Sequence, residues 1–151
     1  MHVRTATHED RTALPALHTA AVLEFGSSDY DTEDVGKWAK VDDRSLEDYE
    51  TDSGDHFTVA IRSDTVAEFG HLVPNSGEIH AVYVHPDHAG RGVGSALLAE
   101  LEGYARGCGL TELTLQSSLN AVGFYEGAGY DKIGEGESPG GLAVVEMRKH
   151  I

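Results

Sequence analysis

The sequence predicts a single domain of the α/β (α+β) class, with a mixed, mostly antiparallel sheet of six to seven strands flanked by about four helices. Two observations predict this class. Segments in which apolar residues alternate with polar ones interchange with segments of helical period, in the order βααβββαβαββ. The chain also has 151 residues, of which 40% are hydrophobic, which is enough for one compact core over residues 1–151.

The N-terminal third begins with a short strand over residues 2–6, after which Thr7 is placed to cap a helix. Pro15 makes that helix irregular. Its large apolar residues recur at loosely helical spacing: Leu14, Leu17, Val22 and Phe25. Residues 24–55 then hold twelve acidic and three basic side chains and few large apolar ones, so we expect short helices and loops there.

The middle of the chain predicts three antiparallel strands in series, because its apolar residues change to a period of two and turn residues interrupt them. The strands are expected at residues 57–61, 66–73 and 79–84, joined by turns at residues 63–64 and 74–77.

The C-terminal third returns to helical spacing over residues 92–107, with Val93, Leu97, Leu101 and Tyr104 on one face. We expect a further strand around residues 113–115 and a short helix over residues 120–128. A final hairpin is predicted from residues 130–133 and 142–147.

A glycine-rich turn, Ala89-Gly-Arg-Gly-Val-Gly-Ser95, connects the strand at residues 79–84 to the following helix. Glycines allow a close approach of the backbone, and the free N–H groups at a helix N-terminus attract anions, so the turn predicts a phosphate site. It is not a P-loop, because Ser95 stands where a lysine is required. It is not a dinucleotide fingerprint either, because its pattern is G-x-G-x-G and not G-x-G-x-x-G.

Two segments together resemble the GNAT family of N-acetyltransferases. The turn with Ser95-Ala-Leu-Leu resembles the family's coenzyme A pyrophosphate loop, and Asn120-Ala-Val-Gly-Phe-Tyr-Glu-Gly-Ala-Gly-Tyr130 resembles its later helix. The resemblance implies a GNAT fold, with the sheet splayed between the fourth and fifth strands, and an acetyltransferase that uses acetyl-CoA as co-substrate. In one departure, Ala89 stands where the family usually has Gln or Arg, which removes side-chain contacts and leaves the backbone amides.

The resemblance also implies how acetyl-CoA binds. Backbone amides of the turn hold the pyrophosphate, with Arg91 either an added cationic contact or a solvated surface residue. The splayed strand pairs with pantetheine like an added strand, and the Val82 N–H polarises the acetyl carbonyl. Asn120 caps its helix and also contacts pantetheine or the acceptor, although capping alone explains it. The implied coenzyme-binding residues are Val82, Tyr83, Val84, Ala89, Gly90, Arg91, Gly92, Val93, Gly94, Ser95 and Asn120.

Three residues are candidates for catalysis. Glu78 stands, by resemblance, where histone acetyltransferases of this superfamily carry their glutamate base. His80, two residues on, shares its strand face and can share or replace that role; the alternative for Glu78 is a solvated carboxylate at a strand start. Tyr125 matches the family tyrosine that reaches the coenzyme sulfur and donates to the leaving thiolate. Its alternative is an aromatic core anchor.

The charge balance limits which kinds of binding partner are expected. With 26 acidic against 11 basic side chains the net charge is −15, which argues against nucleic acid and, because lysine is scarce, predicts a halophilic source. Residues 24–55 carry nine of these net negative charges, and the family builds its acceptor site there. A cationic small-molecule or peptide amine is therefore expected, while a halophilic surface accounts for the same carboxylates. A noncatalytic acyl-CoA-binding sensor is the second functional hypothesis.

The remaining patterns argue against other sites. Cys108 is the only cysteine, so it forms no internal disulfide, and we interpret it as a small packing residue. The other histidines lack ligand spacing, so no metal is expected, and we interpret them as polar surface residues. No apolar run reaches the roughly 20 residues of a membrane span, and no signal peptide is present, which predicts a cytoplasmic protein without a membrane partner. The sequence does not decide between a monomer and a homodimer, and GNAT domains are frequently dimers.

Overall fold

The computed structural model describes residues 2–25, 54–84, 92–138 and 141–151. In these residues a seven-stranded sheet has the order β1-β2-β3-β4-β5-β7-β6. The strands are β1 (His2–Thr5), β2 (His56–Arg62), β3 (Thr65–Val73), β4 (Glu78–Val84), β5 (Glu112–Ser117), β6 (Asp131–Glu137) and β7 (Ala143–His150). The helices are α1 (Leu14–Phe25), α3 (Val93–Gly107) and α4 (Val122–Gly127), with short 3-10 helices η1 (Asp10–Ala13) and η6 (Leu119–Ala121).

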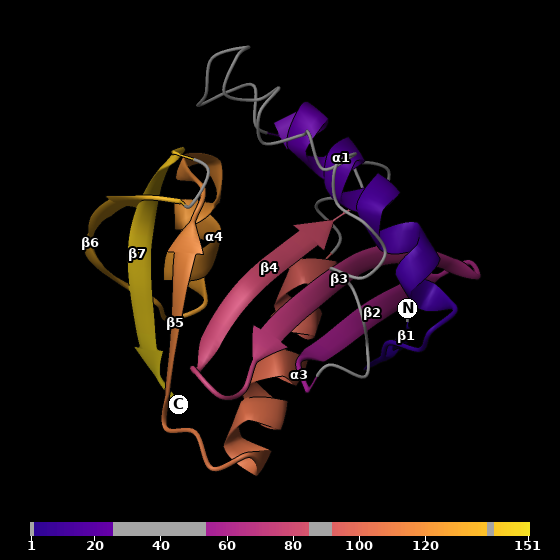
Figure 1. The fold of residues 1–151 in the computed structure, drawn as a ribbon, viewed down its shortest axis with the longest axis horizontal. Helices are drawn as coiled ribbons and strands as arrows, with labels where there is room; N and C mark the ends of the chain where they lie inside the picture. The colour runs from indigo at the N-terminus through magenta and orange to yellow at the C-terminus, as the bar shows by residue number, and fades with distance from the viewer. Residues whose placement is uncertain (1, 26–53, 85–91, 139–140) are drawn as a thin grey trace.

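The sheet is antiparallel except where β4 meets β5. Those two strands run parallel and pair at only two positions, Glu78 with Thr114 and Ile79 with Leu115. Beyond these pairs the strands diverge, so that β1 to β4 form one limb of the sheet and β5, β7 and β6 the other (Figure 1). The predicted mixed, mostly antiparallel sheet and its splay between the fourth and fifth strands are confirmed.

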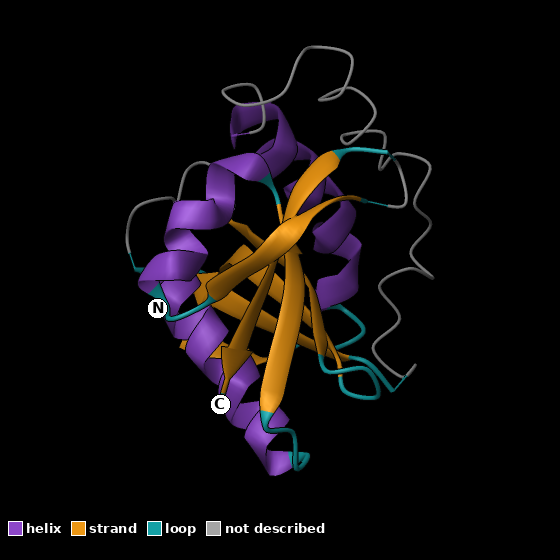
Figure 2. Ribbon diagram, turned by 90° about the vertical axis from the view of Figure 1, so that its left-hand side faces the viewer, coloured by secondary structure: helices purple, strands orange, loops and turns teal. Residues whose placement is uncertain are grey.

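Helices cover both faces of the first limb. Leu14 and Leu17 of α1 pack with Phe57 and Phe69 on one face. A larger cluster on the other face joins α3 to β2, β3 and β4, and includes Ala60, Leu72, Ile79, Leu97 and Leu101. Figure 2 shows helices on both sides of the strands. Strand β2 is therefore buried at every residue from 56 to 60, because neighbouring residues on a strand point to opposite, equally covered faces.

Gly70 of β3 sets how closely α3 approaches the sheet. A Cβ atom at this position would lie 2.5 Å from Leu97 Cδ2 and 2.8 Å from Leu101 Cδ1. Both distances are shorter than real carbon contacts, so only glycine fits with the helix at this depth. The close packing fixes α3 against β3, and with it the position of the N-terminal end of α3.

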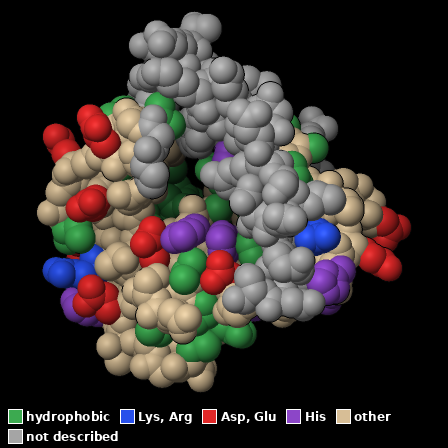
Figure 3. Space-filling view, viewed as in Figure 1, with side chains coloured by type: hydrophobic (Ala, Val, Ile, Leu, Met, Phe, Trp, Pro, Cys, Tyr) green, Lys and Arg blue, Asp and Glu red, His purple; other side chains and the backbone are tan. Residues whose placement is uncertain are grey.

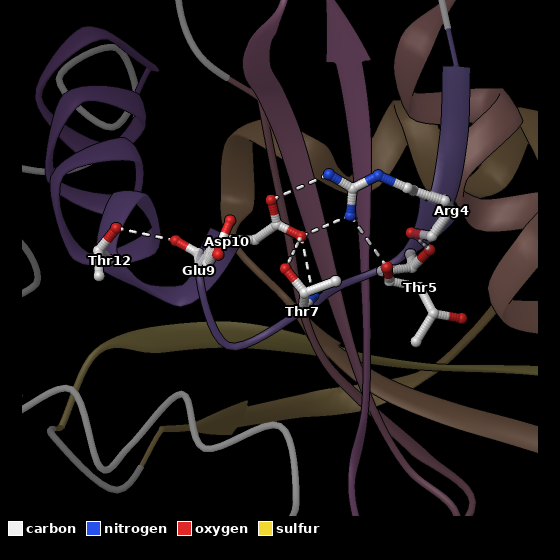
Figure 4. A network of polar contacts seen from close by, with 7 residues as sticks. Arg4, Thr5, Thr7, Glu9, Asp10 and Thr12 are labelled. Atoms are coloured by element: carbon white, nitrogen blue, oxygen red, sulfur yellow. Dashed lines mark hydrogen bonds and ion pairs between the residues drawn. The ribbon is translucent and has the colours of Figure 1, made fainter.

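The turn between β1 and α1 corrects one expectation about Thr7. Its hydroxyl and its backbone N–H both donate to Asp10 Oδ2, at 3.1 and 2.8 Å, so Thr7 does not cap α1 (Figure 4). Arg4 pairs with the same carboxylate, and this contact holds the pKa of Asp10 below its usual range. The chain turns through η1 before α1 begins at Leu14.

Other local expectations are settled by single residues. Ser63 and Asp64 have φ angles of 51° and 62°, which is the turn geometry that joins two antiparallel strands tightly. Cys108 was expected to be packed, and this is wrong: it is exposed at the C-terminal end of α3. The second helix expected in residues 24–55 falls largely on 26–53, outside the described residues. None of the described helices is both long and apolar enough to cross a membrane.

Candidate active site

The divergence of β4 from β5 leaves an opening between the two limbs of the sheet in the part of the chain that the structure describes. Residues 81–84 of β4 are paired with β3 on one side, but the register of β4 with β5 ends at Ile79. Backbone N–H and C=O groups on this inner edge of β4 can therefore accept an extended ligand as an added strand. Figure 3 shows a hollow at the centre of this face, with apolar side chains inside it and histidine and acidic side chains gathered along its rim.

The N-terminal end of α3 lies beside this opening. Gly92 precedes the helix with a φ of 75°, and among the described residues no side chain caps the free N–H groups of the first turn. A Cβ at Gly94 would lie 3.1 Å from the Phe124 ring and 3.4 Å from Glu68 Oε1, so glycine keeps the backbone here accessible. Uncapped amides on a 15-residue helix suit a phosphate group. Ala89, Gly90 and Arg91 of the predicted loop lie outside the described residues.

Tyr125 is carried into this region by α4. Its side chain is buried, with its ring edge-on to Phe124 at 5.1 Å and to Tyr130 at 5.8 Å between centroids. Burial, and then the nearby Tyr83 and Glu68, raise the pKa of the Tyr125 phenol above its usual value. The phenol is therefore a hydrogen-bond donor at neutral pH.

Asn120, by contrast, does not cap the helix as predicted. It lies exposed within η6, while Ala121 occupies the N-cap of α4 and no side chain accepts a hydrogen bond there. The capping role is wrong because Asn120 lies inside the 3-10 turn that precedes α4, and the N-cap position falls to Ala121. Whether Asn120 contacts the coenzyme stays a prediction.

Glu78 and His80 lie together at the beginning of β4. His80 Nε2 is 3.3 Å from Glu78 Oε1, and both side chains are partly exposed. The register of β3 with β4 shifts here: His71 is opposite Ala81 while Leu72 is opposite Ile79, which leaves His80 as an extra residue. Such a bulge redirects a side chain that strict alternation would have placed elsewhere.

Two further residues, His71 and Asp55, extend this pair, and neither was predicted from the sequence. His71 of β3 lies edge-on to His80, with ring centroids 5.0 Å apart, and its Nε2 is 2.8 Å from Asp55 Oδ2. The ring of Phe57 stacks on His71 at 4.1 Å. Alternation along β3 could have placed His71 on the face of Phe69, but nothing in the sequence pairs it with Asp55. We call these four residues, Asp55, His71, His80 and Glu78, the histidine–carboxylate row.

Glu68 of β3 is a further residue of this region that was not predicted from the sequence. It is completely buried, and neither carboxyl oxygen has a hydrogen-bond partner among the described residues. Burial raises the pKa of Glu68 to about 8, so the group is largely protonated at neutral pH. Leaving a buried polar group unpaired costs roughly 1–3 kcal/mol, which a structural role alone does not offset.

The histidines are not all the polar surface residues that composition suggested. His18 is fully buried, with its ring 4.2 Å from that of Tyr83. His56 is also buried, where its Nε2 lies 3.1 Å from Glu100 Oε1 and its ring stacks on Tyr104. Both serve as amphipathic packing residues, because an imidazole offers an apolar ring face together with polar nitrogens.

Comparison with known proteins agrees with this geometry. The family profile described as acetyltransferase (GNAT) domain matches residues 27–151. Since this is most of the chain, the chain belongs to the GNAT acetyltransferase family, and the resemblance carried by the glycine-rich turn and the later helix is confirmed. The family transfers acetyl groups, and its fold accounts for the splayed sheet seen here.

Solved structures and curated relatives fit the same family. A GCN5-related N-acetyltransferase from Rhodopseudomonas palustris superposes with a TM-score of 0.91 at 29% identity, covering 99% of this chain and 95% of that one. The PaiA N-acetyltransferase from Thermoplasma acidophilum, solved with coenzyme A, has the same fold, with a TM-score of 0.79 at 22% identity, over 99% and 98% of the chains.

Among curated proteins, the N-alpha-acetyltransferase RimI of Mycobacterium tuberculosis is 33% identical over 70 residues, which are 46% of this chain and 44% of the relative. The L-amino acid N-acyltransferase MnaT of Escherichia coli is 60% identical over 30 residues, 20% of this chain and 17% of the relative. The matches thus span less than half the length of these relatives.

Proposed function

We propose that this protein transfers an acetyl group from acetyl-CoA to a primary amine of a small molecule or peptide, by direct attack within a ternary complex. The observation that carries the proposal is the opening between β4 and β5, which joins an unpaired strand edge to the uncapped amides of α3. Few ligands match a long strip of amide groups that ends at an anion site, and the pantetheine and pyrophosphate of coenzyme A do so.

In this proposal the coenzyme is held mainly by backbone. The amides of residues 90–95 bind the pyrophosphate, with Arg91 as a cationic contact, and Ala89 begins the loop. The edge of β4 at residues 82–84 pairs with pantetheine. The Val82 N–H then polarises the thioester carbonyl, a contribution that needs no particular side chain. Asn120 contacts the pantetheine or the acceptor from the other limb.

Two groups are assigned to proton transfer, a base that accepts the amine proton and an acid that protonates the leaving thiolate. An amine attacks only as the free base, and the proton that it loses passes to Glu78 or His80, which lie 3.3 Å apart at the start of β4. His71, held by Asp55, orients the His80 ring. As the new C–N bond forms and the C–S bond breaks, Tyr125 donates its phenolic proton to the leaving thiolate, and solvent restores it. The base releases the amine proton to solvent, so the products are an amide and a thiol and the proton count closes.

Substitutions separate these assignments. Tyr125→Phe is expected to lower kcat at least tenfold, with acetyl-CoA affinity nearly unchanged, because the ring stays and only the donor is lost. Glu78→Gln is expected to depress kcat most strongly near neutral pH. If Glu78→Gln left the rate intact while His80→Gln did not, His80 would be the base.

The acceptor is proposed to be cationic. Nine of the fifteen net negative charges fall in residues 24–55, and a field of this sign attracts amines. Relatives and structural neighbours are named for N-alpha-acetylation, for L-amino acids and for aminoglycosides. An informative panel therefore contains basic and neutral amino acids, N-terminal peptides, an aminoglycoside and a polyamine.

A sensor that binds acyl-CoA without turnover is the second proposal. The protonated Tyr125 and the Glu78–His80 pair argue against it, because binding alone requires neither. Thiol release from acetyl-CoA with the amine panel distinguishes the two. Tight coenzyme binding with no release above the rate without amine would favour the sensor.

We also propose, from the composition, the cellular environment and the partners of the protein. The net charge of −15 suits a cytoplasm of high salt, as in a halophile, and is unsuited to nucleic acid. Neither a metal nor a membrane partner is needed for the chemistry proposed here. A homodimer, if formed, should leave residues 82–84 accessible, because the coenzyme occupies that edge.

A further inference from the structure

Glu68 has no part in the acyl transfer described above, and yet it lies beside the site. The side chain is fully buried, it forms no ion pair among the described residues, and neither of its oxygens meets a donor or acceptor there. Buried carboxyls that serve only the fold are normally paired. Glu102 of α3 shows this: it accepts a hydrogen bond from Tyr130 at 2.9 Å and pairs with Lys149 at 3.1 Å.

The surroundings of Glu68 point its oxygens towards the proposed coenzyme site. Glu68 is opposite Val84, the last residue of the free β4 edge. Its Oε1 lies 3.4 Å from where a Cβ of Gly94 would be, in the first turn of α3, and the Phe124 ring lies against the same glycine. Two elements that would hold the coenzyme, β4 and α3, therefore meet at this carboxyl.

A protonated, neutral Glu68 is compatible with an anionic ligand beside it. Burial raises its pKa to about 8, so near pH 7 the group is a neutral acid with one O–H to donate. The titratable group that interacts with it is the phenol of Tyr125 on α4; the described first turn of α3 contributes none. Neither of these elements supplies a positive charge that would favour the carboxylate.

We propose that Glu68 is a further coenzyme-binding residue, which donates a hydrogen bond from its protonated carboxyl to an acceptor oxygen in the pantetheine and pyrophosphate part of acetyl-CoA. The inference rests on the proposed function, since it takes the opening between β4 and β5 as the coenzyme site. It assigns a specific role to a side chain that the fold leaves unpaired. Once ionised, the same carboxyl repels the phosphates and offers no proton, so coenzyme affinity should fall as pH rises through 8.

The test measures binding of acetyl-CoA by calorimetry, without an acceptor amine, at pH 7 and pH 9. Tyr125 stays protonated over this range, and every other group that titrates is the same in Glu68→Gln, so the difference between wild type and Glu68→Gln isolates the contribution of Glu68. For a pKa of about 8, the wild-type affinity is expected to fall about tenfold between the two pH values. Glu68→Gln keeps a neutral donor, and its affinity should stay within about twofold at both pH values.

Glu68→Leu separates binding from structure. It removes the hydrogen bond but fills the same volume with apolar atoms, so affinity at pH 7 should fall roughly fivefold to tenfold while the protein becomes more stable. Unchanged affinity together with higher stability would overturn the proposal. If this variant fails to fold, the comparison of wild type with Glu68→Gln still decides.

Glu102→Gln is the matched control, because it is also a buried glutamate facing the interior. It should reduce stability but leave acetyl-CoA affinity and its pH dependence as in the wild type. An equal loss of affinity in wild type and Glu68→Gln at pH 9 would contradict the role of Glu68. Absence of acetyl-CoA binding in every variant at both pH values would instead contradict the proposed function.

Discussion

Glu68 and Glu102 show how differently two buried glutamates can be used within one small domain. Glu102 has its charge compensated by Lys149 and its hydrogen-bonding capacity used by Tyr130. Glu68 has neither, and it keeps its proton because ionisation in an apolar setting is unfavourable. The first stabilises the fold, whereas the second reduces its stability near a site that can use it.

The protonation of Glu68 makes a prediction for stability. The pKa is about 8 in the folded protein and near its ordinary value in the unfolded chain, so the unfolded chain loses this proton first. Wild-type stability therefore falls as pH rises from about 4.5 to 8, by at most about 1.4 kcal/mol per pH unit from this group. Glu68→Gln removes that loss. Its advantage in urea midpoint over the wild type should grow between pH 5 and pH 8, and an advantage that is constant with pH would contradict the assignment.

The histidine–carboxylate row makes a second prediction. Asp55→Asn weakens the contact that holds His71, and so loosens the support of His80 without changing the coenzyme site. We expect kcat to fall roughly twofold to tenfold, with the acidic limb of its pH profile displaced, while acetyl-CoA affinity is unchanged. Steady-state rates over pH 6 to 9, with calorimetric binding alongside, check this. A loss of affinity with unchanged kcat would show that the row does not act on the base.

At the level of elements, the contact between β3 and α3 determines where the anion site lies. Gly70→Ala would force a methyl group to within 2.5 Å of Leu97 Cδ2, and overpacking of this kind costs about 1–3 kcal/mol. Gly103→Ala is the matched control, because it adds the same methyl group to the exposed side of α3, where nothing lies within 4 Å. It should stabilise the helix by roughly 0.5–1 kcal/mol. Chemical denaturation of the two variants should therefore give shifts of opposite sign, and equal shifts would contradict the close approach.

The elements were largely predictable, because strands and helices impose different periods on apolar residues. The three strands β2, β3 and β4 and the helix α3 follow from such periods and from turn residues such as Ser63 and Asp64. The splay of the sheet came from the resemblance to a family, and the order of strands across the sheet was not predicted, since no local pattern encodes which strands are neighbours.

The parts of the site that could not be predicted depend on tertiary contacts between different elements. The bulge at His80 is a difference in register between two strands, and the contact of His71 with Asp55 joins residues 16 apart. The burial of Glu68 could not be predicted because a polar residue in a strand is normally assigned to a solvent-exposed face. This part of β3 is covered on both faces, so no such exposed face exists. The predictions of a packed Cys108 and a capping Asn120 were wrong for a simpler reason. Both residues lie at helix ends, where a shift of one turn changes exposure and capping.

For the whole molecule, the net charge of −15 on 151 residues is the dominant electrostatic feature. Like charges on a compact chain repel one another, and salt shortens the range of that repulsion from about 10 Å at 0.1 M to about 3 Å at 1 M. The melting temperature is therefore expected to rise by several degrees between 0.1 M and 2 M potassium chloride. The exposed carboxylates of β6 provide a comparison: Asp131→Asn combined with Glu135→Gln and Glu137→Gln should reduce the rise. A melting temperature that falls with salt would mean that ion pairs such as Arg4 with Asp10 outweigh the repulsion.

The central claim is acetyl transfer from acetyl-CoA to an amine, and product formation tests it most directly. Wild-type protein and Tyr125→Phe are incubated with acetyl-CoA and the amine panel in high salt, with thiol release followed over time and the products weighed by mass spectrometry. The account predicts amine-dependent thiol release by the wild type, an acceptor heavier by one acetyl group, and a rate at least tenfold lower for Tyr125→Phe. Tight acetyl-CoA binding with no acetylated product from any amine would contradict it.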